Sequence, residues 1–297
     1  MSVLVIGGSI DNILIVKKLK LTGFRVVLID RNPFCVARQY CDVFEEISTF
    51  DYEPQMALLQ RYSVFYCVTR STGIAAKNCY RLNEILFFGQ ASSLADTILD
   101  KGKLSLFCAD NEILYPRTQI ACKDSEKTRF QRPFVIKPIY EKIGKVTTFK
   151  VGVSEDFNDF IDRSNINSYV HQSIIQEYID GDDYSLIGYV HNQKYVNFGL
   201  FYEKNTILEG KVKHDGFFLD HVLGLEPFME IASKIAKMIY IPLCPLNIGF
   251  RVSEGCVVLL ECNLDFGGER VIEDLLSTCE LDLLGNFFAE LKNLEMR

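Results

Sequence analysis

The chain has 297 residues, of which 48% are apolar and 24% are charged, and its formal net charge is −7. Such a chain can bury a large core in about two or three compact units, and it lacks the basic blocks of a nucleic-acid groove. No apolar run reaches the roughly 18 residues of a membrane span, and the N-terminus lacks the basic region of a signal peptide. We therefore expect a cytoplasmic protein with small-molecule partners and with no nucleic-acid or membrane partner. A homodimer is possible.

The first 95 residues alternate predicted strands and helices. Strands are expected at Val3–Ile6 and Phe24–Ile29, with a helix at Asn12–Leu21 between them. A further strand at Val64–Val68 precedes a helix at Ile74–Phe88. This alternation predicts a parallel sheet with helices on its faces.

The turn after the first strand tests for a dinucleotide site. Such a site needs Gly-x-Gly-x-x-Gly, whereas the chain has Gly7 and Gly8 but none of the later glycines. Asp30, at the end of the second strand, could bind a ribose as in NAD enzymes. An NAD-dependent oxidoreductase is therefore kept as a rival, and a turn that only shapes the sheet is favoured over it.

The middle of the chain is expected to contain a lysine whose ammonium group is partly buried. A helix is expected at Asp100–Asp110, followed by strands at Phe134–Lys137 and Lys145–Val151 and a helix at Ser154–Arg163. Lys137 ends an apolar strand and precedes a proline, so its ammonium is expected to be partly buried. Burial of a charge is costly unless an anion pairs with it, and a phosphate would serve. The alternative is a strand-end lysine whose ammonium reaches solvent.

Three antiparallel strands are expected next, at Ile174–Ile179, Ser185–Val190 and Lys194–Tyr202. The turn between the first two leaves backbone N–H and C=O groups free to bind an adenine edge, at about 1 kcal/mol net for each hydrogen bond. Asp183 could then accept the ribose hydroxyls. The alternative is a solvated acidic hairpin.

A second candidate site lies near the C-terminus. A helix is expected at Pro227–Met238, then strands at Leu246–Val252 and Cys256–Cys262, and a last helix at Leu281–Leu294. The last strand ends in an acid and an amide two residues apart, so both side chains point to the same side. Such a pair of oxygen donors suits Mg²⁺, which in turn binds phosphate oxygens. The two residues are Glu261 and Asn263.

Taken in order, these features resemble the ATP-grasp superfamily, and the resemblance covers nearly the whole chain. Asp100-Lys101 and Pro116-Arg117-Thr118 resemble the entry helix of that fold and the turn that follows it. The resemblance implies a mixed α/β and α+β fold class, with an N-terminal Rossmann-like parallel sheet followed by a two-lobed ATP-grasp fold. It implies a Rossmann-like domain at 1–95, a small lobe at 96–173, and a large lobe with the metal site at 174–297.

The resemblance also implies roles for individual residues, with ATP and Mg²⁺ (or Mn²⁺ in its place) as the bound species. Nucleotide contacts are expected from Lys101, Lys137, Lys145, Gln176, Glu177, Tyr178, Ile179 and Asp183. Metal ligands are expected at Asn247, Glu261 and Asn263. Charge on the reacting phosphoryl group could be neutralised by Lys211, Lys213, His214, Arg251 or Arg270, in compensation for a family arginine that this chain lacks.

The chain departs from the family in three places. The phosphate-covering loop, Pro138–Lys145, has one glycine where the family is rich in Gly and Ser. A neighbouring strand has Asn247 and Gly249 where the family carries a further metal ligand, so a second Mg²⁺ is in question. Leu264-Asp265 stands where the family often has Pro-Arg, which leaves phosphoryl charge less neutralised.

We expect an ATP-dependent ligase that activates a carboxylate as an acyl phosphate and joins it to an amine or a thiol. A non-catalytic nucleotide-binding protein on the same scaffold is the main alternative. The sequence names neither the acid nor the nucleophile.

Overall fold

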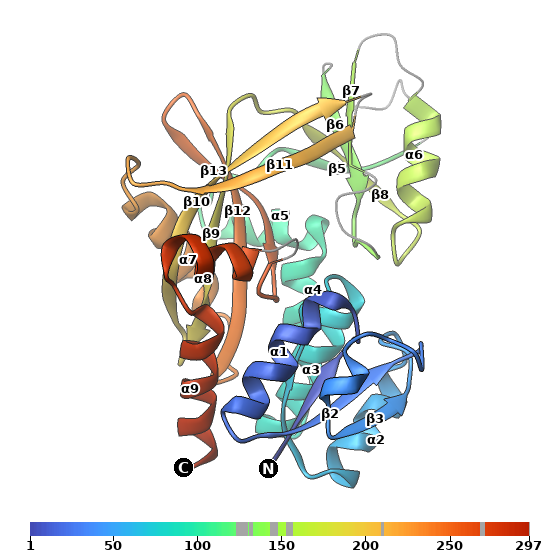
Figure 1. Ribbon diagram of the computed structural model, residues 1–297. Helices are drawn as coiled ribbons and strands as arrows, with labels where there is room; N and C mark the ends of the chain where they lie inside the picture. Colours follow the sequence, from blue (N-terminus) through green and yellow to red (C-terminus); the bar gives the residue numbers. More distant parts are fainter. Residues whose placement is uncertain are drawn as a thin grey trace.

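The computed structural model describes residues 1–122, 130, 133–142, 148–152, 157–208, 211–267 and 271–296, without the side chains of 205–208, 211–215, 274 and 278. The N-terminal part contains one parallel sheet with the strand order β3-β2-β1-β4 (Figure 1). Its elements are β1 (Ser2–Ile6), α1 (Ile10–Leu21), β2 (Arg25–Asp30), β3 (Val43–Glu46), α2 (Tyr52–Arg61), β4 (Val64–Val68) and α3 (Ile74–Phe88).

Helices cover both faces of this sheet because its strands alternate apolar side chains on the two sides. Val3 and Val5 of β1 pack in one core with α1 and the C-terminal helices. Leu4 and Ile6 point to the opposite face and pack with α2 and α3. The alternating strands and helices predicted for this region are confirmed, and β3 and α2 are additions that the sequence analysis missed.

Within the described residues, the second sheet has nine strands in the order β13-β12-β9-β10-β11-β7-β6-β8-β5, all with antiparallel pairing. The strands are β5 (Thr118–Ile120), β6 (Phe134–Pro138), β7 (Phe149–Val151), β8 (Ser173–Glu177), β9 (Asp182–His191), β10 (Lys194–Leu208), β11 (Lys211–Leu219), β12 (Leu243–Ser253) and β13 (Cys256–Asn263). The helices of this part are α4 (Leu94–Leu99), α5 (Lys101–Asp110), α6 (Phe157–Ile166), α7 (Glu226–Ala236), α8 (Val271–Cys279) and α9 (Leu283–Glu295).

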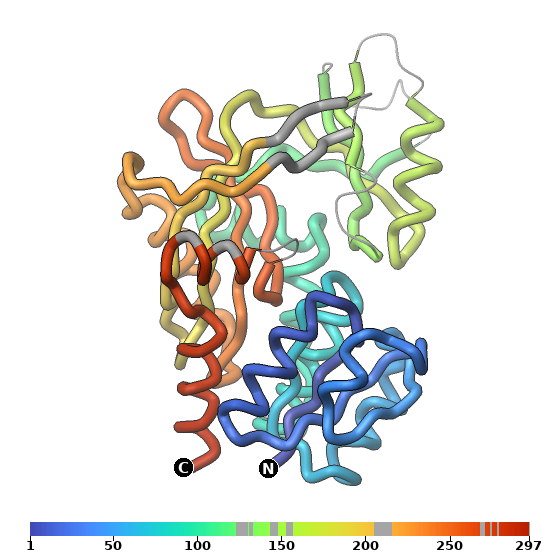
Figure 2. Tube along the Cα trace, in the orientation of Figure 1, coloured from blue at the N-terminus to red at the C-terminus, as the bar shows by residue number. Residues whose placement is uncertain are grey.

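The two ends of this sheet have different cores. Strands β5 to β8 and helix α6 form a small lobe with its own cluster around Phe134, Phe149 and Phe157. Strands β9 to β13 form a large lobe that shares a core with the N-terminal sheet, because Tyr66 and Tyr189 both pack on Phe287. Figure 2 shows α9 beside the N-terminal part of the molecule, and α9 contacts α1 there. The large lobe and the N-terminal part thus form one packed body.

Several expected boundaries shift. Strand β8 ends at Glu177, and it pairs with β5 and β6, so by pairing it lies with the small lobe. The helix expected from Ser154 begins at Phe157 in the described part of the chain. Helix α8 was missed, although its apolar residues repeat at helical spacing. None of the described helices is both long and apolar enough to cross a membrane.

Candidate functional site

Two lysines approach the space between the lobes from the small-lobe side. Lys137 sits on β6, and only 8% of it is exposed. Burial, and after it the charge of Lys101, lower the pKa of Lys137 to about 8, while Glu261 and Glu141 act in the opposite sense. Lys101 begins α5 and is also buried, with its Nζ 3.4 Å from a carboxylate oxygen of Glu141. Two buried cations that repel each other favour a bound polyanion.

A set of paired side chains lies where β8 ends and β9 begins, and we call it the hinge group: Arg117, Gln176, Glu177, Asp183 and Arg251. Gln176 is buried, and its amide nitrogen donates to the Thr118 hydroxyl at 2.8 Å. The Arg117 guanidinium and backbone N–H both donate to the Glu177 carboxylate, at 2.6 and 2.9 Å. The side chains of Gln176 and Glu177 are therefore engaged within the protein, and the backbone is the part of this segment suited to an adenine edge.

Arg251 lies at the hinge group. It faces Asp183 across the β12–β9 pair and donates to one carboxylate oxygen through Nε at 2.8 Å and Nη2 at 2.6 Å. Its Nη1 donates to the backbone oxygen of Ile179 at 2.7 Å. The Tyr178 ring lies 5.7 Å from the same guanidinium and 3.6 Å from the Lys150 ammonium. The structure thus pairs Arg251 with the expected ribose acid, in the pocket that Lys137 and Glu261 also line, and its expected role at the reacting phosphoryl group stays a prediction.

Glu261 and Asn263 end β13 and lie opposite Gly249 and Asn247 of β12. The Asn247 side chain has a buried oxygen, Oδ1, that meets no hydrogen-bond partner among the described residues. An acid and two amide oxygens gathered at one strand end, with one oxygen unsatisfied, fit a hard divalent cation. The described residues contain no group of three or more His, Cys, Asp or Glu side chains placed to hold a metal ion. A cation there would need phosphate or water oxygens as well.

One pocket of about 90 Å³ between the lobes is lined by Lys137, by Asp183 and Arg251 of the hinge group, and by the strand-end acid Glu261. Lys137 and Thr148 line it from the small lobe. The large lobe contributes Asp183, Arg251, Gly249 and Glu261, and also Glu203 of β10. Glu203 was missed by sequence reasoning because nothing local marks it: it is one acid in a long strand.

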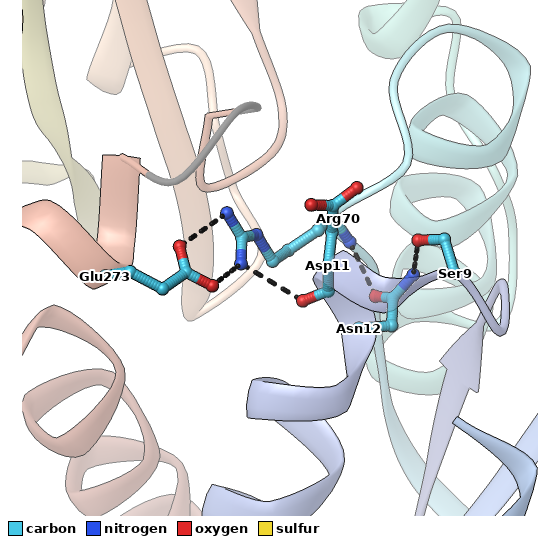
Figure 3. Close-up of polar contacts among 5 residues, drawn as sticks. All are labelled: Ser9, Asp11, Asn12, Arg70 and Glu273. Carbon is cyan, nitrogen blue, oxygen red and sulfur yellow. Dashed lines mark hydrogen bonds and ion pairs between the residues drawn. The ribbon is translucent and has the colours of Figure 1, made fainter. Parts of the chain in front are cut away.

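A second set of polar residues lies at the carboxyl ends of β1 and β4, next to α8 (Figure 3). Arg70 is fully buried, and it donates to the backbone oxygen of Asp11 at 3.1 Å and to both carboxylate oxygens of Glu273, at 2.8 and 3.3 Å. Asn12 accepts the backbone N–H of Arg70 at 3.0 Å. The Arg70–Glu273 contact thus joins the N-terminal sheet to α8.

Arg70 shares one property with the metal-binding candidate Asn247 and with Asp265: each has a buried side-chain atom without a hydrogen-bond partner among the described residues. We call these three residues the strand-end group. Within the described residues, Nε of Arg70 and Oδ2 of Asp265 meet no hydrogen-bond partner. The other Asp265 oxygen accepts the Gly267 backbone N–H at 2.8 Å. Burial raises the pKa of Asp265 to about 6, and the charge of Arg70 opposes that rise. The sequence analysis noted Asp265 only as a departure from the family.

Other expected site residues cannot be placed in the same detail. Lys145 and Arg270 lie outside the described residues. Lys211 and Lys213 lie on β11, where the backbone of Lys211 pairs with Phe149 of the small lobe, but their side chains are outside the described part. Asp30 is held by the N-terminal turn, since its carboxylate accepts the backbone N–H groups of Gly8 at 2.7 Å and Asn32 at 2.8 Å.

No family model and no curated protein matches this chain. Solved structures do match. The L-amino acid ligase from Bacillus licheniformis has a TM-score of 0.75 at 13% identity, over 97% of this chain and 73% of that one. The N5-carboxyaminoimidazole synthetase from Staphylococcus aureus, complexed with ADP, has a TM-score of 0.75 at 12% identity, over 96% and 77%. The biotin carboxylase from Campylobacter jejuni has a TM-score of 0.71 at 12% identity, over 96% and 70%. These likenesses confirm the fold class expected from the sequence.

Proposed function

We propose that this chain, which has the ATP-grasp fold, is an ATP-dependent ligase that activates a carboxylate as an acyl phosphate and joins it to an amine or thiol. The observation that carries the proposal is the meeting of Lys137 and Glu261 in one pocket between two lobes. A buried ammonium and a strand-end acid on opposite walls suit a nucleotide whose phosphates need both a fixed cation and a metal ion. The solved structures of similar fold are ligases, synthetases or carboxylases by their titles, and two of them are complexed with ADP, which supports the proposal.

Each residue would then act by position and charge. Lys101 and Lys137 would hold phosphate oxygens, and the backbone between Glu177 and Asp180 would bind the adenine edge. Glu261 and Asn263, with Asn247, would hold Mg²⁺, which when bound would neutralise charge on the transferring phosphoryl group. Such alignment of reactants can lower a barrier by about 7–11 kcal/mol without proton chemistry by the protein.

The carboxylate substrate would lie on the side of the strand-end group. The carboxyl ends of β1 and β4 form the switch point of the N-terminal sheet, where ligands of such sheets bind. Arg70 and Asp265 bring buried charges of both signs to this place. This placement supports an acceptor site between the N-terminal sheet and the metal, next to the phosphate that must be attacked.

A phosphate-release screen tests the proposal. The protein would be incubated with ATP and Mg²⁺ and an array of carboxylates, each paired with amines or thiols. We expect phosphate release only when a specific acid is present. Tight nucleotide binding with no phosphate release for any pair would favour the second candidate, a non-catalytic nucleotide-binding protein. Gly249 is the observation that favours this candidate, because β12 then has no acid opposite Glu261. Tight NADH binding without ATP binding would reject both.

A further inference from the structure

Glu203 is a buried acid in the nucleotide pocket to which neither the fold nor the motifs assign a role. It lies on β10 with 6% of its surface exposed, and it lines the same pocket as Lys137 and Glu261. The Ser185 hydroxyl of β9 donates a hydrogen bond to one of its carboxylate oxygens. The pocket suits a polyanion, and a carboxylate that lines it can share a divalent cation with such a ligand.

The hydrogen bond fixes where this carboxylate lies across the sheet. Glu203 is paired along the strands with Asp183, but its carboxylate reaches the hydroxyl of Ser185, two residues further along β9. Ser185 lies opposite Gly249, and Gly249 lies opposite Glu261. The carboxylate of Glu203 therefore lies level with Glu261 across the sheet, although the Glu203 backbone lies level with Asp183, the expected ribose acid.

Gly249 lies between these two acids and has no side chain to separate them. A Cβ placed on Gly249 would be 3.1 Å from Cγ and 3.7 Å from Oε1 of Glu261, so the Glu261 side chain leans over the glycine. Neighbouring strands are about 4.8 Å apart, so Ser185 and Glu261 are about two such spacings apart. One carboxylate lies at each side of this gap, and both carboxylates line the same pocket as Gly249.

We infer that Glu203 supplies the second carboxylate for the divalent cation, a role that β12 cannot fill because Gly249 stands at the matching position. The inference rests on the proposed function, since it concerns the cation that accompanies the nucleotide. Glu261 binds the cation from β13 and Glu203 binds it from β10, while Ser185 orients Glu203. Nucleotide phosphates and water complete the oxygen shell that Mg²⁺ requires.

Mn²⁺ binding measured by electron paramagnetic resonance, with ADP present, tests the inference without any turnover. Glu203→Gln keeps the side-chain shape and an oxygen for the Ser185 hydroxyl, and it removes the charge. We expect Glu203→Gln to weaken Mn²⁺ binding by at least about tenfold, and Ser185→Ala by up to about tenfold, as for a residue that orients a ligand. Glu230→Gln, on the exposed side of α7, is the matched control and should bind Mn²⁺ as the native protein does.

Two results would overturn the inference. One is unchanged Mn²⁺ binding by a folded Glu203→Gln variant while Glu261→Gln loses it, which would leave the proposed function intact. The other is a loss of ADP affinity in Glu203→Gln that is equal with and without Mn²⁺, which would make Glu203 a ribose acceptor beside Asp183. Native protein that binds neither Mn²⁺ nor ADP would instead reject the proposed function.

Moving the carboxylate gives a second measurement. In the double variant Glu203→Gln, Gly249→Asp, the acid returns to β12, next to Glu261. Gly249 does not have a positive φ, and a Cβ added there requires the Glu261 side chain to shift by only a few tenths of an ångström. We expect the double variant to regain most of the Mn²⁺ affinity that the single variant loses.

Discussion

The hinge group and the strand-end group satisfy their buried polar atoms in different ways. In the hinge group, Arg251 donates to Asp183 and Ile179, and Arg117 donates to Glu177. In the strand-end group, Arg70, Asn247 and Asp265 each keep a buried atom without a partner among the described residues. Such atoms cost about 1–3 kcal/mol each, so proteins rarely keep them without a reason. We therefore expect the hinge group to keep its position without a ligand, and the strand-end group to gain hydrogen-bond partners when a ligand binds.

The largest effect is expected at Glu261, near the end of β13 and next to the strand-end group. Glu261→Gln keeps the shape and removes the anionic oxygen that Mg²⁺ prefers. We expect turnover to fall by about 10²-fold or more, as when one group that stabilises transition-state charge is lost. Thermal stability should change little, which a melting curve would check. Phosphate release close to the native rate would remove Glu261 from the metal site.

Lys137 gives the next largest effect, on nucleotide affinity. Lys137→Ala removes charge-assisted hydrogen bonds of about 1.5–3 kcal/mol each, which corresponds to roughly tenfold to a hundredfold in affinity. Calorimetric titration with ATP and Mg²⁺ would measure it. Native affinity in this variant would mean that Lys137 does not contact the phosphates.

The pKa of Lys137 also predicts a pH dependence. Because burial lowers that pKa from 10.5 to about 8, the nucleotide-free protein loses this ammonium as the pH rises through about 8. A bound polyanion favours the charged form, so affinity should be greatest below pH 8 and should decline above it. Lys137→Arg stays charged over this range and should remove most of the decline. An equal decline in both proteins would assign the effect to another group.

The Arg70–Glu273 contact is expected to have a smaller effect, on stability. The two partners should differ in how much their replacement costs. Arg70 is fully buried, whereas 37% of the Glu273 side chain is exposed. Glu273→Gln therefore leaves a buried charge without its counter-ion and should cost about 2–3 kcal/mol in the free energy of unfolding. Arg70→Met leaves only a half-exposed carboxylate and should cost less. Urea denaturation would measure both, and the reverse order would show that Arg70 contributes mainly through packing.

The smallest effect is expected at the rim of the hinge group. The Arg117 side chain is 74% exposed, and exposed ion pairs contribute about 0.2–1 kcal/mol. Arg117→Ala should lower stability by no more than about 1 kcal/mol, and ATP affinity should change only slightly. A large loss of affinity would show that the hinge backbone depends on this pair for its position.

Local periodicity accounts for what the sequence could predict. Alternation along β13 places Glu261 and Asn263 on one side, and the apolar run before Lys137 indicates a buried strand end. Both statements need only neighbouring residues. The parallel N-terminal sheet follows in the same way from its alternating segments.

What the sequence could not predict depends on register between distant strands. Glu203 reaches Ser185 only because β10 pairs with β9 in one register, and Arg251 meets Asp183 through the pairing of β12 with β9. Arg70 and Glu273 are 203 positions apart in the chain, and their contact follows from the docking of α8 on the N-terminal sheet. No local pattern carries such information.

The separate core of the small lobe has a consequence for local opening. The N-terminal sheet and the large lobe share the aromatic cluster around Phe287, so amides in β1 and β12 should exchange with solvent hydrogen only on global unfolding. Among the described residues, the small lobe has a separate cluster of seven buried residues, although Ile139, Tyr140 and Ile174 pack in the core of the large lobe. Its amides should exchange through cheaper, local opening. Since Lys137 belongs to this lobe, nucleotide binding should slow exchange in β6 and leave β1 unchanged.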